Sequence, residues 1–319
     1  MTLPALRMLA AAGLVTLVAG CAAAANGASS KEPQATSTTT TTKAEASTTT
    51  TAPQETGSTE IGPVDRRARL VAPDAVTAPA PLLILLHGYT ATAAGQDAYL
   101  GVSEQAASRG LYVLLPNGTS GPDGRSFWDA APACCNFTGS PVDDVGYLRS
   151  LIKEAIEVRP IDPARIYVFG HSNGGFMAYR LACELADEIA GVAVLAGSEG
   201  EAAQDCTPSR PVSVLHLHGD ADALITYGGG RTVRPFPGTI EVVSRWAERA
   251  SCNPDPIDGG RLDLDTGIVG EETAVLAYEG CADGVAVQLD TIEGGSHSPA
   301  LDHGRVGTEV LDWLLSHSR

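Results

Sequence analysis

The strongest constraint on the fold is a glycine-flanked serine that follows an apolar segment. Residues 165–169 have the pattern of a buried strand, Gly170-His171-Ser172-Asn173-Gly174 matches G-x-S-x-G, and residues 174–185 have the pattern of a helix. Glycine is needed on both sides of such a turn, because side chains there would collide with the neighbouring strand and helix. The sequence therefore predicts a strained turn that presents Ser172 at the carboxyl end of a strand.

Strand and helix patterns alternate on both sides of this turn. Strands are predicted at 81–86, 111–115, 165–169, 191–195, 212–217 and 285–289, and helices at 103–109, 143–158, 174–185, 239–249 and 306–317. Such alternation predicts a mostly parallel central sheet with helices on both faces. Together with the serine turn, it predicts the α/β-hydrolase fold.

In this fold the serine is followed along the chain by an acid and then by a histidine. Asp222 is the predicted acid, because it lies a few residues past a strand; the alternative, Asp220, would be a turn residue. His297 is the predicted base, on a glycine-flanked loop after the last strand, whereas its competitor His303 begins the last helix. An imidazole suits this role because it titrates near neutral pH. Ser172, Asp222 and His297 are thus the predicted catalytic residues.

Two backbone amides are predicted to bind the oxyanion that forms when a serine attacks a carbonyl. One belongs to Asn173, directly after the nucleophile, and the other to Tyr89 in the loop after an earlier strand. His87 ends that strand and is interpreted as a structural residue.

Substrate contacts are predicted for His171 and for Trp128 in a long loop, since long loops in compact domains are usually functional. Trp128, Phe137 and Tyr89 could equally line a cleft or pack in the core. At the end of this loop, Asp143 or Asp144 either caps the next helix or organises the loop through a hydrogen bond.

The sequence predicts no metal and no organic cofactor. His216 and His218 alternate on one face of a strand, which could suggest a metal site. No third ligand lies nearby in the sequence, so we interpret the pair as packing or as support for the site. The chain also has no Cys-x-x-Cys spacing of the kind that binds zinc.

The amino terminus indicates export. Residues 1–21 are interpreted as a signal peptide, because Arg7 precedes an apolar run that is short for a membrane span and ends in Val18-Ala19-Gly20-Cys21. This ending resembles a bacterial lipobox, in which Cys21 would carry the lipid that anchors the protein to the membrane. Residues 22–60 are rich in Thr, Ser and Ala and predict a disordered tether, and 61–319 are assigned to the catalytic domain.

Six cysteines remain beside Cys21, and an even number in an exported chain suggests disulfides. We expect Cys252 to pair with Cys281. Cys134 and Cys135 are adjacent and are predicted not to bond, because the ring would be strained. The other pairings stay open.

The formal net charge of −17 argues against nucleic acid as a partner, since phosphate binding needs basic patches. The partners expected instead are a small or polymeric ester and, through Cys21, the membrane.

Residues 69–315 resemble the esterase family that contains polyhydroxybutyrate depolymerases and feruloyl or acetylxylan esterases. The resemblance rests on several motifs: His87-Gly88, Phe127-Trp128 with Cys134-Cys135, Val142-Asp143-Asp144-Val145-Gly146, Gly170 to Gly175 with Met177 to Cys183, His218-Gly219 with Asp222, and Gly294-Gly295-Ser296-His297. It implies the same triad. Where the family usually has Trp-Pro after the histidine and Pro after the acid, this chain has Ser298-Pro299 and Ala223, so the family's substrates transfer only loosely.

The sequence therefore predicts a secreted, membrane-anchored serine esterase that works through an acyl-enzyme, acting on polyhydroxyalkanoate, feruloyl or acetyl esters. A serine peptidase of the same fold and a non-catalytic surface lipoprotein are the alternatives.

Overall fold

The computed structural model describes residues 57–76 and 79–319, and the structural statements below concern those residues. Cys21, the predicted signal peptide and all but the last residues of the predicted tether lie outside them. No helix within the described ranges is both long enough and apolar enough to span a membrane.

A ten-stranded sheet runs through the described part of the chain, in the order β1-β2-β4-β3-β7-β8-β9-β14-β13-β12. Its strands are β1 (Ser58–Ile61), β2 (Ala68–Val71), β3 (Ala80–Leu86), β4 (Tyr112–Leu115), β7 (Ile161–His171), β8 (Gly191–Leu195), β9 (Ser213–Gly219), β12 (Ile257–Leu262), β13 (Thr273–Tyr278) and β14 (Val287–Ile292). The strands from β4 to β14 in this order are parallel, and the two at each edge are antiparallel. The predicted mostly parallel sheet is confirmed.

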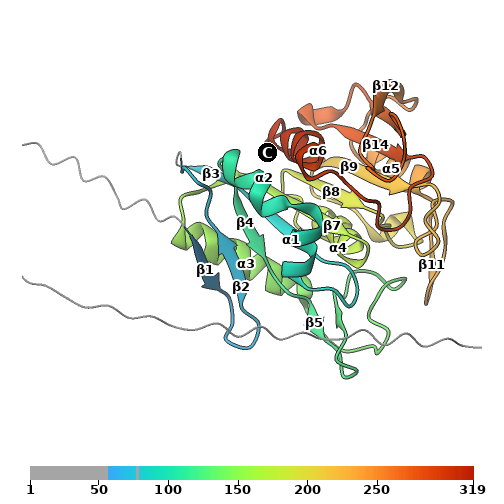
Figure 1. Cartoon of the computed structure of the whole chain (residues 1–319). Helices are drawn as coiled ribbons and strands as arrows, with labels where there is room; N and C mark the ends of the chain where they lie inside the picture. Colours follow the sequence, from blue (N-terminus) through green and yellow to red (C-terminus); the bar gives the residue numbers. More distant parts are fainter. Residues whose placement is uncertain (1–56, 77–78) are drawn as a thin grey trace, which may run out of the picture. The chain divides into compact units, whose positions relative to one another are not determined.

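Helices cover both faces of the sheet (Figure 1). They are α1 (Ala93–Leu100), α2 (Val102–Ser108), α3 (Asp144–Val158), α4 (Asn173–Glu184), α5 (Thr239–Arg249), α6 (His303–Arg305) and α7 (Asp312–Leu315), with a π-helical segment, Val306–Leu311, between the last two. One buried cluster joins the sheet to α3, α4 and α5, and a second joins the opposite face to α1, α2 and the carboxyl-terminal helical segment. The sheet contributes to both clusters because successive side chains of a strand point to opposite faces. In β3, for example, Leu82 belongs to the first cluster and Leu83 to the second, as expected of a strand buried on both faces.

Short elements lie in the connections between these strands and helices. Two hairpins lie in the loops, β5 (Thr119–Ser120) with β6 (Ser126–Phe127) and β10 (Gly230–Arg231) with β11 (Pro235–Phe236). Single 3₁₀ turns occur at η1 (Ala203–Asp205) and η2 (Ala282–Gly284).

Several boundaries differ from the sequence prediction, and strands β2, β12 and β13 were not predicted. Strand β1 begins at Ser58 and pairs with β2, so the last residues assigned to the tether belong to the sheet. The closing helix predicted at 306–317 is divided into a π-helical segment and α7. The central strands are those predicted, although the bounds of β7 and β14 differ by a few residues from the predicted ones.

Three disulfides are present in the described chain. Cys252 is bonded to Cys281, as predicted, and Cys183 is bonded to Cys206. The prediction that Cys134 and Cys135 do not bond is wrong. Their peptide bond is cis and their Cα atoms lie 3.0 Å apart, whereas the prediction expected ring strain to prevent the bond.

Asp290 on β14 is a buried acid that should make stability depend on pH. Burial raises the pKa of its carboxyl to about 7, a hydrogen bond from Gln288 opposes the rise, and the Glu309 carboxylate adds to it. Because the folded-state pKa lies above the unfolded value, the folded protein binds an extra proton between about pH 4 and 7. The free energy of unfolding should therefore fall across this window by up to about 1.4 kcal/mol per pH unit and level off above it.

The variant Asp290→Asn removes this titration and should flatten that part of the curve. Urea unfolding of both proteins from about pH 5 to 8 gives the comparison, since all other groups contribute equally to both. Parallel stability curves for the two proteins would contradict the assignment.

Candidate active site

Ser172 occupies a strained turn between β7 and α4. Its backbone has a φ of 54° and a ψ of −119°, a region that non-glycine residues rarely adopt. A side chain at Gly174 would collide with the carbonyl oxygen of Leu86 on β3, and one at Gly170 with the carbonyl of Gly174. The two glycines let strand and helix approach closely enough for the turn to form.

The structure brings Ser172, His297 and Asp222 together from three different loops. His297 Nε2 lies 2.9 Å from Ser172 Oγ, and His297 Nδ1 lies 2.7 Å from Asp222 Oδ2. Ser172 and His297 are partly exposed, whereas Asp222 is buried. This is the order and geometry of a nucleophile, a base and an orienting acid.

Four donors surround the Asp222 carboxylate. Oδ2 accepts from His297 and from His218 Nε2, at 3.2 Å, and Oδ1 accepts from the amides of Leu224 and Ile225, at 2.7 and 3.0 Å. Burial by itself raises the pKa of this carboxyl, but hydrogen bonds from His218, His297 and Leu224 outweigh it and hold the pKa well below its ordinary value. Asp222 is therefore ionised at neutral pH.

The two acid candidates have separate roles. Asp220 Oδ1 accepts from the amide of Gly294 at 2.6 Å, which ties the loop after β9 to the loop that carries His297. The Ala221 amide donates to Gly295 at 3.1 Å and makes a second tie. The other histidine candidate, His303, contacts the carbonyl of Tyr99 instead.

The Asn173 amide lies directly after Ser172, and Gly88, the residue before Tyr89, lies next to the Ser172 side chain. Asn173 is the first residue of α4, so its amide has no partner within the helix. The loop with Tyr89 is fixed by its neighbours, since the Thr90 amide donates to Ser126 and the Ala91 amide donates to Gly88. These positions suit a pair of oxyanion donors.

His87 lies behind this loop in a structural position. Its side chain is buried, and its Nε2 accepts a 2.8 Å hydrogen bond from the Gly118 amide.

His171 lies behind His297. Its Nε2 donates to the His297 carbonyl oxygen at 3.0 Å, and the two rings are 5.2 Å apart. Burial lowers the pKa of His171 to about 4, so the ring is neutral near pH 7. His171 was predicted to contact substrate, but its side chain faces the loop of His297 and is only 7% exposed.

The prediction that Trp128 contacts substrate is corrected by its burial. The side chain is 0% exposed, and its Nε1 donates to the carbonyl of His87 at 3.0 Å. Its backbone exchanges two hydrogen bonds with the Asn173 side chain, at 2.7 and 3.0 Å. Trp128 thus attaches the long loop to the start of α4.

The sequence left two roles open for the aspartate pair, a helix cap and a hydrogen bond to the long loop. Each aspartate has one of these roles. Asp143 caps α3 by accepting from the Gly146 amide at 2.8 Å. Asp144 is fully buried and organises the long loop: it accepts from Thr119 Oγ1 at 3.1 Å and from the Asp129 amide at 2.7 Å.

Asp144 also forms a 2.7 Å ion pair with Arg66. The Arg66 guanidinium in turn lies over the rings of Tyr147 and Trp128. Sequence reasoning missed Arg66, because nothing in its neighbourhood along the chain indicates a partner so far away.

An exposed aromatic side chain lies at the rim of the site. Phe137 is 48% exposed and contacts Tyr89 edge to face, with ring centroids 5.0 Å apart. Leu224, two residues after Asp222, is 67% exposed. Apolar surface is therefore available beside Tyr89 and on the loop that carries Asp222.

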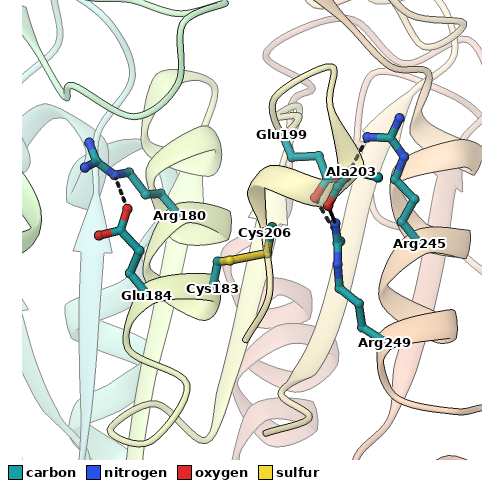
Figure 2. The surroundings of a disulfide bond; sticks show 8 residues. All are labelled: Arg180, Cys183, Glu184, Glu199, Ala203, Cys206, Arg245 and Arg249. Carbon is teal, nitrogen blue, oxygen red and sulfur yellow. Dashed lines mark hydrogen bonds and ion pairs between the residues drawn. A yellow bond between two sulfur atoms is a disulfide. The ribbon is translucent and has the colours of Figure 1, made fainter. Parts of the chain in front are cut away.

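A cavity of about 410 Å³ lies along α4, between residues 129–132 and the loop after β8. Its lining includes Phe176, one helical turn after Ser172. Figure 2 shows how one wall is fixed: Cys206 is bonded to Cys183 of α4, and Glu199 accepts from two arginines of α5. Those arginines, Arg245 and Arg249, also bind carbonyl groups of the same loop.

His216 and His218 are within hydrogen-bond distance of each other, 3.0 Å between Nε2 and Nδ1. Over residues 57–76 and 79–319, no group of three or more His, Cys, Asp or Glu side chains is arranged to hold a metal ion.

Comparison with known proteins identifies relatives. Feruloyl esterase B of Piromyces equi is 32% identical over 244 residues, which cover 73% of this chain and 42% of that enzyme. Putative esterase NocK of Nocardia uniformis subsp. tsuyamanensis is 28% identical over 233 residues, covering 68% and 65%. Poly(3-hydroxyalkanoate) depolymerase C of Paucimonas lemoignei is 31% identical over 137 residues, covering 42% and 32%. The chain is a homologue of these esterases.

The predicted resemblance is thereby confirmed, although this chain spans less than two thirds of the length of each of these relatives. No protein-family model matches the chain. The structure of an acetyl xylan esterase from Aspergillus awamori matches 81% of this chain and 98% of its own, with a TM-score of 0.56 and 15% identity. That likeness confirms the α/β-hydrolase fold.

The two neighbouring aspartates should differ sharply in their effect on stability. Asp144→Ala leaves Arg66 without its partner and removes the acceptor of Thr119 and Asp129, so we expect the free energy of unfolding to fall by about 3 kcal/mol. Asp143→Ala removes only a helix cap and should cost about 1 kcal/mol. Urea unfolding measures both, and equal losses for the two variants would argue against a special role for Asp144.

Proposed function

We propose that this protein is a serine hydrolase that cleaves carboxylic esters through an acyl-enzyme. The observation that carries the proposal is the hydrogen-bonded row Ser172–His297–Asp222, with 2.9 and 2.7 Å between successive side chains. The homology to esterases supports the same reaction class.

In the proposed mechanism Ser172 Oγ attacks the ester carbonyl while His297 Nε2 accepts the hydroxyl proton. The amides of Tyr89 and Asn173 stabilise the oxyanion of the tetrahedral intermediate. His297 then donates the proton to the leaving alcohol, and an acyl group remains on Ser172. Water, deprotonated by His297, hydrolyses this acyl-enzyme, while Asp222 stabilises the positive charge on His297 during both steps.

The substrates proposed are feruloyl, acetyl or hydroxyalkanoate esters outside the cell, with the enzyme anchored to the membrane through Cys21. Relatives named for feruloyl esters and poly(3-hydroxyalkanoate) support the substrate class. Three disulfides suit an oxidising compartment, and the exposed Phe137 offers an apolar contact near the triad.

Replacement of the triad residues tests the reaction. Ser172→Ala should lower kcat for short p-nitrophenyl esters on the order of a million-fold, and Asp222→Asn about ten-thousand-fold, because the base loses its orientation. Ser150→Ala, on the exposed face of α3, is the matched control and should keep full activity. Wild-type activity in Ser172→Ala would refute the proposal, and a panel of feruloyl, acetyl and hydroxybutyrate esters ranks the substrates.

The membrane anchor has a separate test. In a bacterial host, Cys21→Ser should abolish labelling by radioactive palmitate and move the protein from the membrane fraction to the soluble fractions. Ser29→Ala in the neighbouring tether is the control and should stay labelled. A Cys21→Ser protein that remains in the membrane, with an unlabelled wild type, would exclude the lipid anchor.

A further inference from the structure

A row of hydrogen-bonded side chains leads inward from Asp222. The Tyr179 hydroxyl lies 2.6 Å from His216 Nδ1, and His216 Nε2 lies 3.0 Å from His218 Nδ1. His218 Nε2 in turn contacts Asp222 Oδ2 at 3.2 Å. All of these residues are at most 4% exposed. We call Tyr179, His216 and His218 the buried relay.

If the His216 and His218 rings are neutral, one arrangement of their protons gives every hydrogen bond of the relay one donor and one acceptor. His218 Nε2 faces two acceptors, Asp222 Oδ2 and, at 2.7 Å, the carbonyl of Ile225, so this nitrogen carries the proton. His218 Nδ1 must then accept, from His216 Nε2 and from Thr239 Oγ1 at 2.9 Å. His216 Nδ1 accepts in turn from the Tyr179 hydroxyl. Every donor in the relay therefore points toward Asp222.

The opposite arrangement is unfavourable. An imidazolium at His218 would carry a proton on Nδ1 and would make His216 Nε2 an acceptor. His216 Nδ1 would then donate to Tyr179, whose own proton would have no acceptor among the contacts of the described residues. A buried donor without an acceptor is strongly unfavourable.

Burial agrees with the neutral arrangement. It lowers the pKa of His216 well below its ordinary value, and it raises the pKa of Tyr179 well above its own, with the nearby Glu199 adding to the rise.

We propose that the buried relay positions the triad acid, because it holds His218 in the tautomer whose Nε2–H binds both Asp222 and the Ile225 carbonyl. This inference rests on the proposed function. One donor thereby fixes the carboxylate and also the loop whose amides bind Oδ1. His218 is a positioning residue, since it acts through Asp222 and does not contact Ser172 in this arrangement.

Other titratable or charged groups face this region from neighbouring elements. His171 and His297 lie on the side of Asp222 that faces Ser172, and Tyr227 contacts the His218 ring edge to face. Glu199 and Arg249 act on Tyr179 at the far end. These groups are left intact in the variants below, so the variants change only the relay.

The central test compares His218→Leu, which has no donor, with His218→Gln, whose amide can donate near the position of Nε2. We expect His218→Leu to lower kcat by about 10- to 100-fold with little change in KM, the range typical of lost outer hydrogen-bond partners at metal sites. The acid limb of the kcat/KM profile should move to higher pH, because an Asp222 carboxylate without the His218 donor holds the imidazolium form of His297 more strongly. In His218→Gln, both kcat and the position of the acid limb should return much of the way to the wild-type values. An unchanged pH profile in His218→Leu would overturn the proposal.

Trp246→Phe is the control for packing. Trp246 stacks on Tyr179, with ring centroids 5.6 Å apart, and its Nε1 has no hydrogen-bond partner among the described residues. The variant disturbs the same part of the core without removing a hydrogen bond of the relay. It should lower stability and leave the pH profile at the wild-type position; a shift equal to that of His218→Leu would show that the relay acts only through packing.

A second measurement does not depend on activity. In the ¹⁵N-labelled full chain, the His216–His218 bond should give a scalar coupling between His216 Nε2 and His218 Nδ1, and ¹⁵N shifts should show a single proton on His218, at Nε2. Protons on both nitrogens of His218 would overturn the inference even if the variants failed to fold. A wild type that cleaves no ester would refute the proposed function, whereas an active wild type with an insensitive His218→Leu would refute only the relay.

Discussion

The ionised carboxylate of Asp222, buried at the carboxyl edge of the sheet, is the constraint on which the candidate site depends. A buried charge is very unfavourable unless donors replace the water that it loses. Here four donors do so, from β9, from the loop that follows it and from the loop of His297. Those donors can all reach one carboxylate only if the loops are held in a single arrangement, so the charge of Asp222 and the rigidity of its surroundings require each other.

The sheet order explains why these loops meet. Strands β7, β8, β9 and β14 are adjacent and parallel, so their carboxyl ends lie along one edge. Ser172 follows β7, Asp222 follows β9 and His297 follows β14. The Asp220–Gly294 bond and the Ala221–Gly295 bond then join the second and third loops directly. The sheet sets the distances between the three loops, and a few hydrogen bonds between the loops fix the positions of the side chains.

The sequence predicted the parts of this site that depend on local pattern and chain order. The glycines around Ser172 have a strictly local cause, and the order of serine, acid and histidine follows from the fold, so the three residues that the structure brings together could be named from the sequence. Trp128 and His171 were misassigned because burial depends on segments distant in the chain: Trp128 is covered by Arg66 and the start of α4, and His171 by the loop of His297. The Cys134–Cys135 bond was missed because a bond between adjacent cysteines was excluded on the ground of ring strain. The sequence could not show which of Asp143 and Asp144 caps the helix and which binds the long loop. Their side chains point in different directions, and which direction faces the loop depends on how the helix packs.

Three of the buried carboxylates show two ways of avoiding the free-energy cost of burying a charge. Asp222 and Asp144 are each surrounded by several donors, and Asp144 also has the guanidinium of Arg66. Asp290 receives one hydrogen bond, from Gln288, and its second oxygen has no partner among the described residues. Its pKa rises instead, so that a proton neutralises it near pH 7. Neutralisation is harmless at Asp290, whose partner is an uncharged amide. At Asp222 it would remove the charge that stabilises a protonated His297 in the proposed mechanism. The donors around Asp222 are therefore those expected of a position where the carboxylate has to remain charged for the site to work.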